Sequence, residues 1–474
     1  MKGQFFKGLL LIILATGTIY AQDKSLTLSL QEAIDYALEN NRNVQNAKKD
    51  VVVAEKQRWE VIATGLPQIN AAIDYQYWLK QQVSLLPAAA FDNTKSVVDI
   101  VNKYFDATQT NFDISTPQGF IPIKFGTKQS MTATATLSQL LFDGSYLVGL
   151  QSAKVFLEIY KNSKDKTDLE IRKAVINAYG NVLLTEESVK ILEKNKKVLE
   201  NNLNDTRKIY ENGLEEEESV EQLQITLSSI ISNLNNTKRL QALAYKMLNI
   251  TLGTGLETNT ILTDDLESLT QENITLDLLS TSLSLSENID FKIAANETRS
   301  KELLLKLEKS KALPKLTAFV NGGYMGNSGT FTFLDKDQQW FGSSLLGVKL
   351  NIPIFSSGMR SAATQRARIN LEKAKNNMTE VEQQLQLQVA TARSDYQFAI
   401  EEYSNKKENL QLAERIEQKN QTKFFEGVGS SFELRQAQTQ LYTAQQEFLR
   451  AMLAVINKKA ELETVLNTPV VKIN

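Results

Sequence analysis

Histidine and cysteine are both absent from the 474 residues of this chain. Their absence excludes the usual general base, every cysteine-nucleophile mechanism, and the His/Cys ligand sets of zinc and most transition-metal sites. Carboxylate chemistry and oxygen-ligated metals remain open, but the sequence contains no compact cluster of Asp and Glu. We therefore expect no enzyme, no cofactor and no metal site. The lack of cysteine also excludes a lipid anchor on an N-terminal cysteine.

Long apolar runs are also missing after residue 21, since none approaches the roughly 18 apolar residues of a membrane-spanning helix. Residues 1–21 instead have the pattern of a cleaved secretory signal. Lys2 and Lys7 precede an apolar stretch, and small residues lead to an expected cut after Ala21. A retained signal anchor is the alternative. The mature chain would carry 51 basic and 55 acidic residues, and no basic patch indicates a nucleic-acid partner.

Proline is absent from two long spans, 123–313 and 354–468, and glycine is sparse in both. Because an interior proline costs a helix about 3 kcal/mol, these spans are free to form very long helices. A helix over residues 358–424 would be roughly 100 Å long at 1.5 Å per residue. Gly213 and Gly427 interrupt the two spans, and glycine commonly ends a helix in the left-handed conformation. Each span is thus predicted to be a long helix, a tight turn and a returning helix.

The same helical pattern occurs twice, with corresponding positions 214 residues apart. Apolar residues recur at alternating spacings of four and three, which is typical of helices packed along their length. A lysine interrupts both stripes, and a shorter stripe from Leu223 is repeated from Ala437. This duplication predicts a tube or bundle with internal pseudosymmetry. The first stripe is Ile171, Val175, Ala178, Val182, Thr185, Val189, Leu192, Lys196 and Leu199, and the second is Leu385, Val389, Ala392, Tyr396, Ala399, Tyr403, Lys406, Leu410 and Ala413.

Four segments of about ten residues alternate apolar and mostly polar side chains, which predicts strands. They begin near Gln68, Gln129, Lys315 and Leu345. A soluble sheet and an outer-membrane barrel both fit this alternation. The secretory signal, the aromatic residues near the strand ends and the Ser/Thr-rich faces favour the barrel. Four strands cannot close a membrane barrel, whose smallest examples have about eight, so we expect two or three chains to share one.

Several short motifs occur in order and in duplicate, and through them the chain resembles the TolC-type outer-membrane efflux protein family. The resemblance covers essentially the whole mature sequence. It implies a duplicated α+β membrane protein, in which long helical hairpins form a periplasmic α-barrel and four strands per chain contribute to a shared twelve-stranded outer-membrane β-barrel. The motifs are Leu30-Gln-Glu-Ala-Ile-Asp-Tyr-Ala-Leu38, Leu66-Pro67, Phe142-Asp-Gly144, Leu313-Pro314, Phe355-Ser-Ser-Gly358 and the two glycine turns.

The resemblance also implies a function and partners. We expect a homotrimer, surrounded by outer-membrane lipid, that passively conducts substrates as the outer channel of a tripartite efflux or type I secretion system. A periplasmic adaptor protein and an inner-membrane RND or ABC transporter would complete the system. The alternative is a secreted coiled-coil adaptor or scaffold without a pore. An adaptor usually has one central hairpin between symmetric halves, whereas here the strand–helix unit is duplicated in tandem.

The predicted organisation is a signal peptide (1–21), a first repeat (22–270), a second repeat (271–467) and a C-terminal tail (468–474). The family's first helix often continues with Asn-Pro, whereas this chain has Asn41-Arg42. The second repeat is expected to begin with an equivalent helix from about Leu276. The first repeat has an extra segment between its strands, 81–127, interpreted as an extracellular loop. This loop would cap the pore, contact a surface partner or simply be tolerated.

The candidate functional residues lie around the two turns. The resemblance places a periplasmic gate ring at Glu433 and Gln436, where glutamine replaces the usual second acid. A solvated glutamate near a turn is the alternative for Glu433. Gly213 and Gly427 are expected to mark the adaptor-docking tips, although helix termination alone explains them. The acidic run Glu215, Glu216, Glu217 and Glu218 would either gather charge at the tunnel mouth, meet a basic adaptor tip or remain solvated.

Overall fold

The computed structural model describes residues 25–105 and 117–467. The expected signal peptide and C-terminal tail lie outside the described residues. The chain divides into two compact units. Among the described residues, the first comprises 25–58, 151–305 and 364–467, and the second comprises 59–105, 117–150 and 306–363. None of the helices in the described part of the chain combines the length and the apolar character needed to cross a bilayer.

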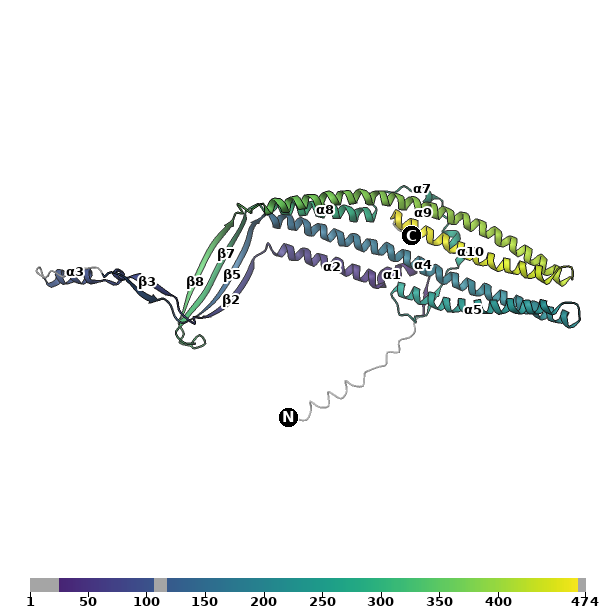
Figure 1. The fold of residues 1–474 in the computed structure, drawn as a ribbon, viewed down its shortest axis with the longest axis horizontal. Helices are drawn as coiled ribbons and strands as arrows, with labels where there is room; N and C mark the ends of the chain where they lie inside the picture. The colour runs from purple at the N-terminus through teal and green to yellow at the C-terminus, as the bar shows by residue number, and fades with distance from the viewer. Residues whose placement is uncertain (1–24, 106–116, 468–474) are drawn as a thin grey trace, which may run out of the picture. The chain divides into compact units, whose positions relative to one another are not determined.

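Two long helical hairpins form most of the first unit, as the distribution of proline predicts. Helix α4 (Gly144–Glu211) returns as α5 (Glu217–Leu252), and α9 (Met359–Phe425) returns as α10 (Ser431–Leu466). Figure 1 shows α4 beside α5 and α9 beside α10. The expected helix over 358–424 is therefore confirmed to within one residue at each end.

The duplicated heptad stripes form the buried seams of these hairpins. Val175, Val182 and Leu199 are fully buried on α4, and Tyr396 is fully buried on α9. The two lysines that interrupt the stripes remain partly exposed. One core cluster combines residues of α4, α9 and α10 with the short N-terminal helix α1 (Leu30–Asn40). The 3.5-residue repeat in the sequence therefore corresponds to real packing.

The four predicted strands form one antiparallel sheet in the second unit, in the order β2–β5–β7–β8. The register places the four apolar sets on the same face, because Ile73 is opposite Ala133, Ala133 is opposite Tyr324 and Leu346 is opposite Val320. Polar residues such as Asn70 and Thr136 share the other face. The strands are β2 (Gln68–Tyr77), β5 (Gln129–Asp143), β7 (Lys315–Ser328) and β8 (Trp340–Asn351).

The extra segment between the first two strands contains regular structure of its own. A short antiparallel pair, β3 (Val83–Pro87) and β4 (Phe120–Lys124), encloses the 3-10 helix η1 (Ala88–Phe91) and helix α3 (Thr94–Phe105). None of its described residues is buried. By contrast, β7 and β8 are joined by a short connection over residues 329–339.

The start of the second repeat differs from the prediction. The prediction of a helix from about Leu276 is wrong, because only a single turn, α7 (Asp277–Ser280), forms before α8 (Ile289–Ser310). The intervening residues 281–288 are mostly Ser, Thr, Glu and Asn. Serine and asparagine hydrogen-bond the backbone in non-helical conformations, which weakens a helix here. In the first repeat α1 and α2 (Arg42–Ala63) are separated only by Asn41.

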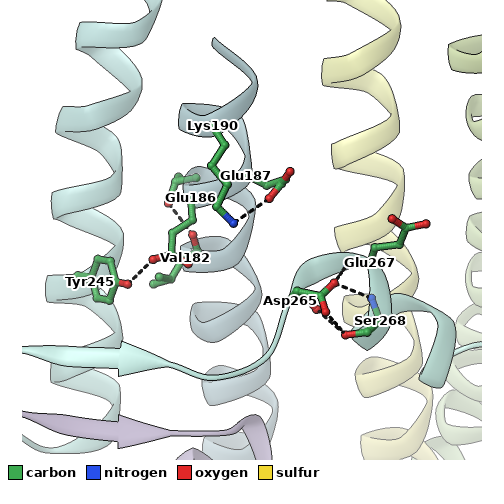
Figure 2. A network of polar contacts seen from close by, with 9 residues as sticks. Val182, Glu186, Glu187, Lys190, Tyr245, Asp265, Glu267 and Ser268 are labelled. Atoms are coloured by element: carbon green, nitrogen blue, oxygen red, sulfur yellow. Dashed lines mark hydrogen bonds and ion pairs between the residues drawn. The ribbon is translucent and has the colours of Figure 1, made fainter. Parts of the chain in front are cut away.

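Small elements complete the first unit beside these helices. A parallel strand pair joins β1 (Leu26–Leu28) to β6 (Thr260–Leu262), and α6 (Leu266–Glu272) follows it. Figure 2 shows Asp265 capping α6 through the backbone N–H groups of Glu267 and Ser268, at 3.0 and 2.9 Å. In the same view the Tyr245 hydroxyl of α5 donates a hydrogen bond to Glu186 of α4. Polar contacts therefore tie α4 to α5 beside the apolar core.

Candidate functional site at the two helical turns

The turns at Gly213 and Gly427 have the same backbone geometry. Their φ angles are +72° and +73°, in the left-handed region that favours glycine. Gly213 N donates to Tyr210 O at 2.8 Å, and Gly427 N donates to Phe424 O at 3.0 Å. A side chain at either position would meet open space. The backbone conformation, and not packing, therefore requires glycine at both turns.

A pair of serine hydroxyls joins the two turns. Ser219 Oγ lies 2.7 Å from Ser431 Oγ and also donates a hydrogen bond to Glu215 Oε1 at 2.5 Å. Ser219 is buried and Ser431 is partly buried. These residues stand at the first turns of α5 and α10, so the returning helices begin side by side. Residues 212 positions apart are thus brought together at one end of the first unit.

The acidic run beside the first turn lies at the N-terminus of α5. Glu216 precedes the helix without a side-chain capping bond, and Glu217 and Glu218 occupy its first turn. Negative charge is favourable there because it complements the helix dipole. Glu216, Glu217 and Glu218 are exposed, whereas Glu215 is partly buried against Ser219. The run therefore has a local structural role and also presents three carboxylates to solvent.

Glu433 and Gln436 are both exposed on α10. The Glu433 carboxylate accepts a hydrogen bond from Ser430 N at 3.2 Å, while Ser430 Oγ accepts one from Glu433 N at 3.2 Å. This reciprocal arrangement is a capping box. The Ser-x-x-Glu pattern at 430–433 was the sequence signal for it. Gln436 lines an open groove of about 930 Å³ with Ile416 and Phe432.

Polar residues occupy the packed seam near the turns, and sequence reasoning missed them. Asn202 of α4 and Gln438 of α10 are 3% and 0% exposed. Gln421 Nε2 of α9 donates to Asn202 Oδ1 at 3.4 Å, while Asn202 Nδ2 and both amide atoms of Gln438 have no hydrogen-bond partner. We call Asn202, Gln421, Gln438 and Glu417 the polar layer. The sequence does contain a signal for buried polar residues here. When the first heptad stripe is continued past Leu199 at spacings of three and four, its next positions are the polar residues Asn202 and Thr206.

The polar layer contains a carboxyl group in an unfavourable environment. Burial raises the pKa of Glu417. Burial also raises the pKa of Tyr442, and the Glu417 charge adds to that effect. Among the described residues no group of three or more Asp or Glu is placed to hold a metal ion. The site therefore offers exposed negative charge and a partly buried polar layer.

Comparisons with known proteins agree over most of the chain. A family model described as "Outer membrane efflux protein" matches residues 33–254 and 281–468. The crystal structure of CusC, a protein that undergoes transmembrane channel formation, aligns with a TM-score of 0.70 at 16% identity, covering 94% of this chain and 93% of that chain. The outer membrane protein VceC of Vibrio cholerae aligns at 0.67 and 15%, covering 92% and 95%.

The outer membrane channel CmeC of Campylobacter jejuni also aligns, with a TM-score of 0.67 at 16% identity, covering 92% of this chain and 85% of that chain. No curated protein matches the sequence. At these identities the solved structures show a shared fold, while the family model matches both repeats separately.

Proposed function

The chain belongs to the outer membrane efflux protein family, and we propose that three copies of it build each channel. It is an outer-membrane efflux channel of TolC type with a periplasmic helical extension. The proposal includes a periplasmic adaptor and an inner-membrane RND or ABC transporter as partners. It excludes the alternative of a scaffold without a pore.

The edges of the four-stranded sheet carry the trimer proposal. Within the described residues, β2 pairs only with β5 and β8 pairs only with β7. An unpaired strand edge in lipid leaves polar backbone groups unsatisfied, at a cost of several kcal/mol each. Pairing β2 of one copy with β8 of the next would satisfy both edges, and three copies would close a ring of twelve strands. The apolar sheet face would then meet lipid and the polar face would line water.

Conduction through this channel is passive in the proposal. The sequence contains no nucleotide-binding or redox motif, so a partner must supply the energy. The two glycine turns are the proposed docking tips for the adaptor. The three exposed carboxylates of the acidic run give the first tip a negative surface, which favours a basic partner surface.

The proposed gate is a ring of Glu433, one from each copy. Glu433 is exposed in the first turn of α10, close to the junction of the two turns. Three carboxylates around an axis would favour cations and hydrate the constriction. Gln436 lies one helical turn further along and contributes polarity without charge. Opening would move α9 and α10 relative to α4 and α5 and carry Glu433 outward.

Reconstitution of the mature chain in planar bilayers tests the proposal. Discrete single-channel steps from samples that migrate as trimers are the expected result. A folded chain that never inserts into a bilayer, or that inserts without forming trimers, would overturn the shared-pore proposal. A closed trimer would be recognised by the appearance of conductance after substitution of Glu433.

A further inference from the structure

The segment between β2 and β5 presents an uncovered apolar surface. Its described residues include Leu85, Phe91 and Phe120, which are 63%, 53% and 68% exposed. None of the described residues from 81 to 127 is buried. The second repeat has no equivalent, because residues 329–339 alone connect β7 to β8. The segment is therefore an addition specific to one repeat.

Helix α3 carries most of this surface on one side. Ile100, Tyr104 and Phe105 are 56%, 71% and 76% exposed. At 100° per residue they share one face with Val97 and Val101, while Lys95, Asp99 and Lys103 fall on the opposite face. A helix with an apolar face in a folded protein normally buries that face against another element. No described element of this chain covers it.

A single copy offers this segment too little stability. Isolated helices shorter than about 12–15 residues are marginal in water, and so is an isolated two-stranded hairpin. Helix α3 has 12 residues and the β3–β4 pair has five residues per strand. The apolar face must therefore be covered by something outside the chain.

The sequence favours further copies of this segment as the cover. Residues 81–127 contain three lysines and four aspartates, so the segment is close to neutral. Association of identical near-neutral segments meets little charge repulsion, and an anionic membrane surface would prefer a basic segment. On α3 the charges alternate in sign at Lys95, Asp99 and Lys103, so the helix carries a net charge of only +1.

The connection to the sheet makes such contact possible. The segment follows directly from β2, whose outer edge is the one proposed to pair with the next copy. Twelve strands spaced about 4.8 Å and tilted about 40° enclose a ring roughly 12 Å in radius. Five-residue strands and a 12-residue helix extend about 17 and 18 Å. Each copy thus has more than enough length to reach the ring's axis.

We propose that the α3 helices of three copies pack their apolar faces against one another and form a cap over the extracellular end of the channel. This inference rests on the proposed trimer. It assigns the exposed apolar residues of α3 to an interface between copies, and it makes the cap a steric restriction on the exit of cargo that is separate from the periplasmic gate.

Single-cysteine cross-linking of the full chain tests the cap, and the absence of native cysteine makes each introduced thiol unique. Tyr104→Cys places a thiol on the apolar face, and Asn102→Cys places one on the polar face as the matched control. Both residues are exposed, so neither substitution removes a core contact. With a short bis-maleimide, Tyr104→Cys is expected to give several-fold more covalent dimer and trimer than Asn102→Cys.

The oligomeric state, measured on native gels of the same samples, separates the two proposals. Intact trimers whose Tyr104→Cys chains cross-link no better than the control would overturn the cap and leave the channel standing. Chains that are not trimers would overturn both. A third outcome concerns lipid. If Tyr104→Cys becomes protected from maleimide only when lipopolysaccharide is added to phosphatidylcholine vesicles, the apolar face of α3 is covered by a lipid surface. That result would overturn the cap.

Discussion

Asn41 and Asn288 make the same hydrogen bonds at equivalent places in the two repeats. Asn41 Nδ2 donates to Thr251 O at 2.7 Å, and Asn288 Nδ2 donates to Val465 O at 2.9 Å. Each side-chain oxygen accepts from two backbone N–H groups at the start of the following helix. The side chain of Asn41 thus caps α2 and ties it to the end of α5. The side chain of Asn288 caps α8 and ties it to the end of α10.

Alanine at Asn41 or Asn288 should destabilise the helical unit. Each substitution removes a helix cap and leaves a partly buried carbonyl without its hydrogen bond, with an expected loss of about 1–3 kcal/mol. Thermal unfolding of the two variants measures this, and Asn43→Ala, at an exposed position in the first turn of α2, is the control. Equal midpoints for Asn41→Ala and Asn43→Ala would contradict the capping role.

Alanine at Gly213 or Gly427 should strain the turn. A residue with a Cβ pays about 1–2 kcal/mol in the left-handed conformation that both glycines adopt. Asparagine tolerates this conformation better, so Gly427→Asn should be milder than Gly427→Ala. Amide hydrogen exchange near the turn measures the loss, with exposed Glu426→Ala as the control. Faster exchange in the control than in Gly427→Ala would refute the explanation.

Glu433 has a capping role in the structure and a gating role in the proposal, and two substitutions separate them. Glu433→Gln keeps a capping-box side chain but removes the charge. Its unfolding midpoint should match the parent chain while cation selectivity in bilayers falls. Ser430→Ala retains the charge and loses the cap, at about 0.5–2 kcal/mol. If Glu433→Gln leaves selectivity unchanged, Glu433 serves only as a cap.

Glu417→Gln should stabilise the protein at neutral pH. Burial raises the pKa of Glu417 above its ordinary value of 4.5, so the folded state disfavours its charged form. The resulting destabilisation is absent below pH 4.5, grows as the pH rises to the folded-state pKa, and is constant above it. The variant should therefore gain more in unfolding midpoint at pH 7 than at pH 4. Exposed Glu414→Gln is the control, and an equal gain at both pH values would rule out the linkage.

Local sequence patterns were sufficient for the long hairpin helices, the four strands of the main sheet and the two glycine turns. The stripe from Ile171 and its repeat from Leu385 are largely buried, because a 3.5-residue repeat can bury its apolar face only along a helix contact. The glycine turns followed from the conformational freedom of glycine. Patterns that were present but unused include the Ser-x-x-Glu box at Glu433 and the polar continuation of the stripe at Asn202.

Contacts between distant residues decided the rest. The order β2–β5–β7–β8 and its register depend on pairs such as Ala133 and Tyr324, which no local window compares. The Ser219–Ser431 contact and the matching bonds of Asn41 and Asn288 likewise depend on packing across the fold. Sequence alone determined the long hairpin helices and the four strands of the main sheet, since periodicity is a local property of the chain. Tertiary structure decided which polar groups find partners, because a hydrogen bond needs both atoms in place at once.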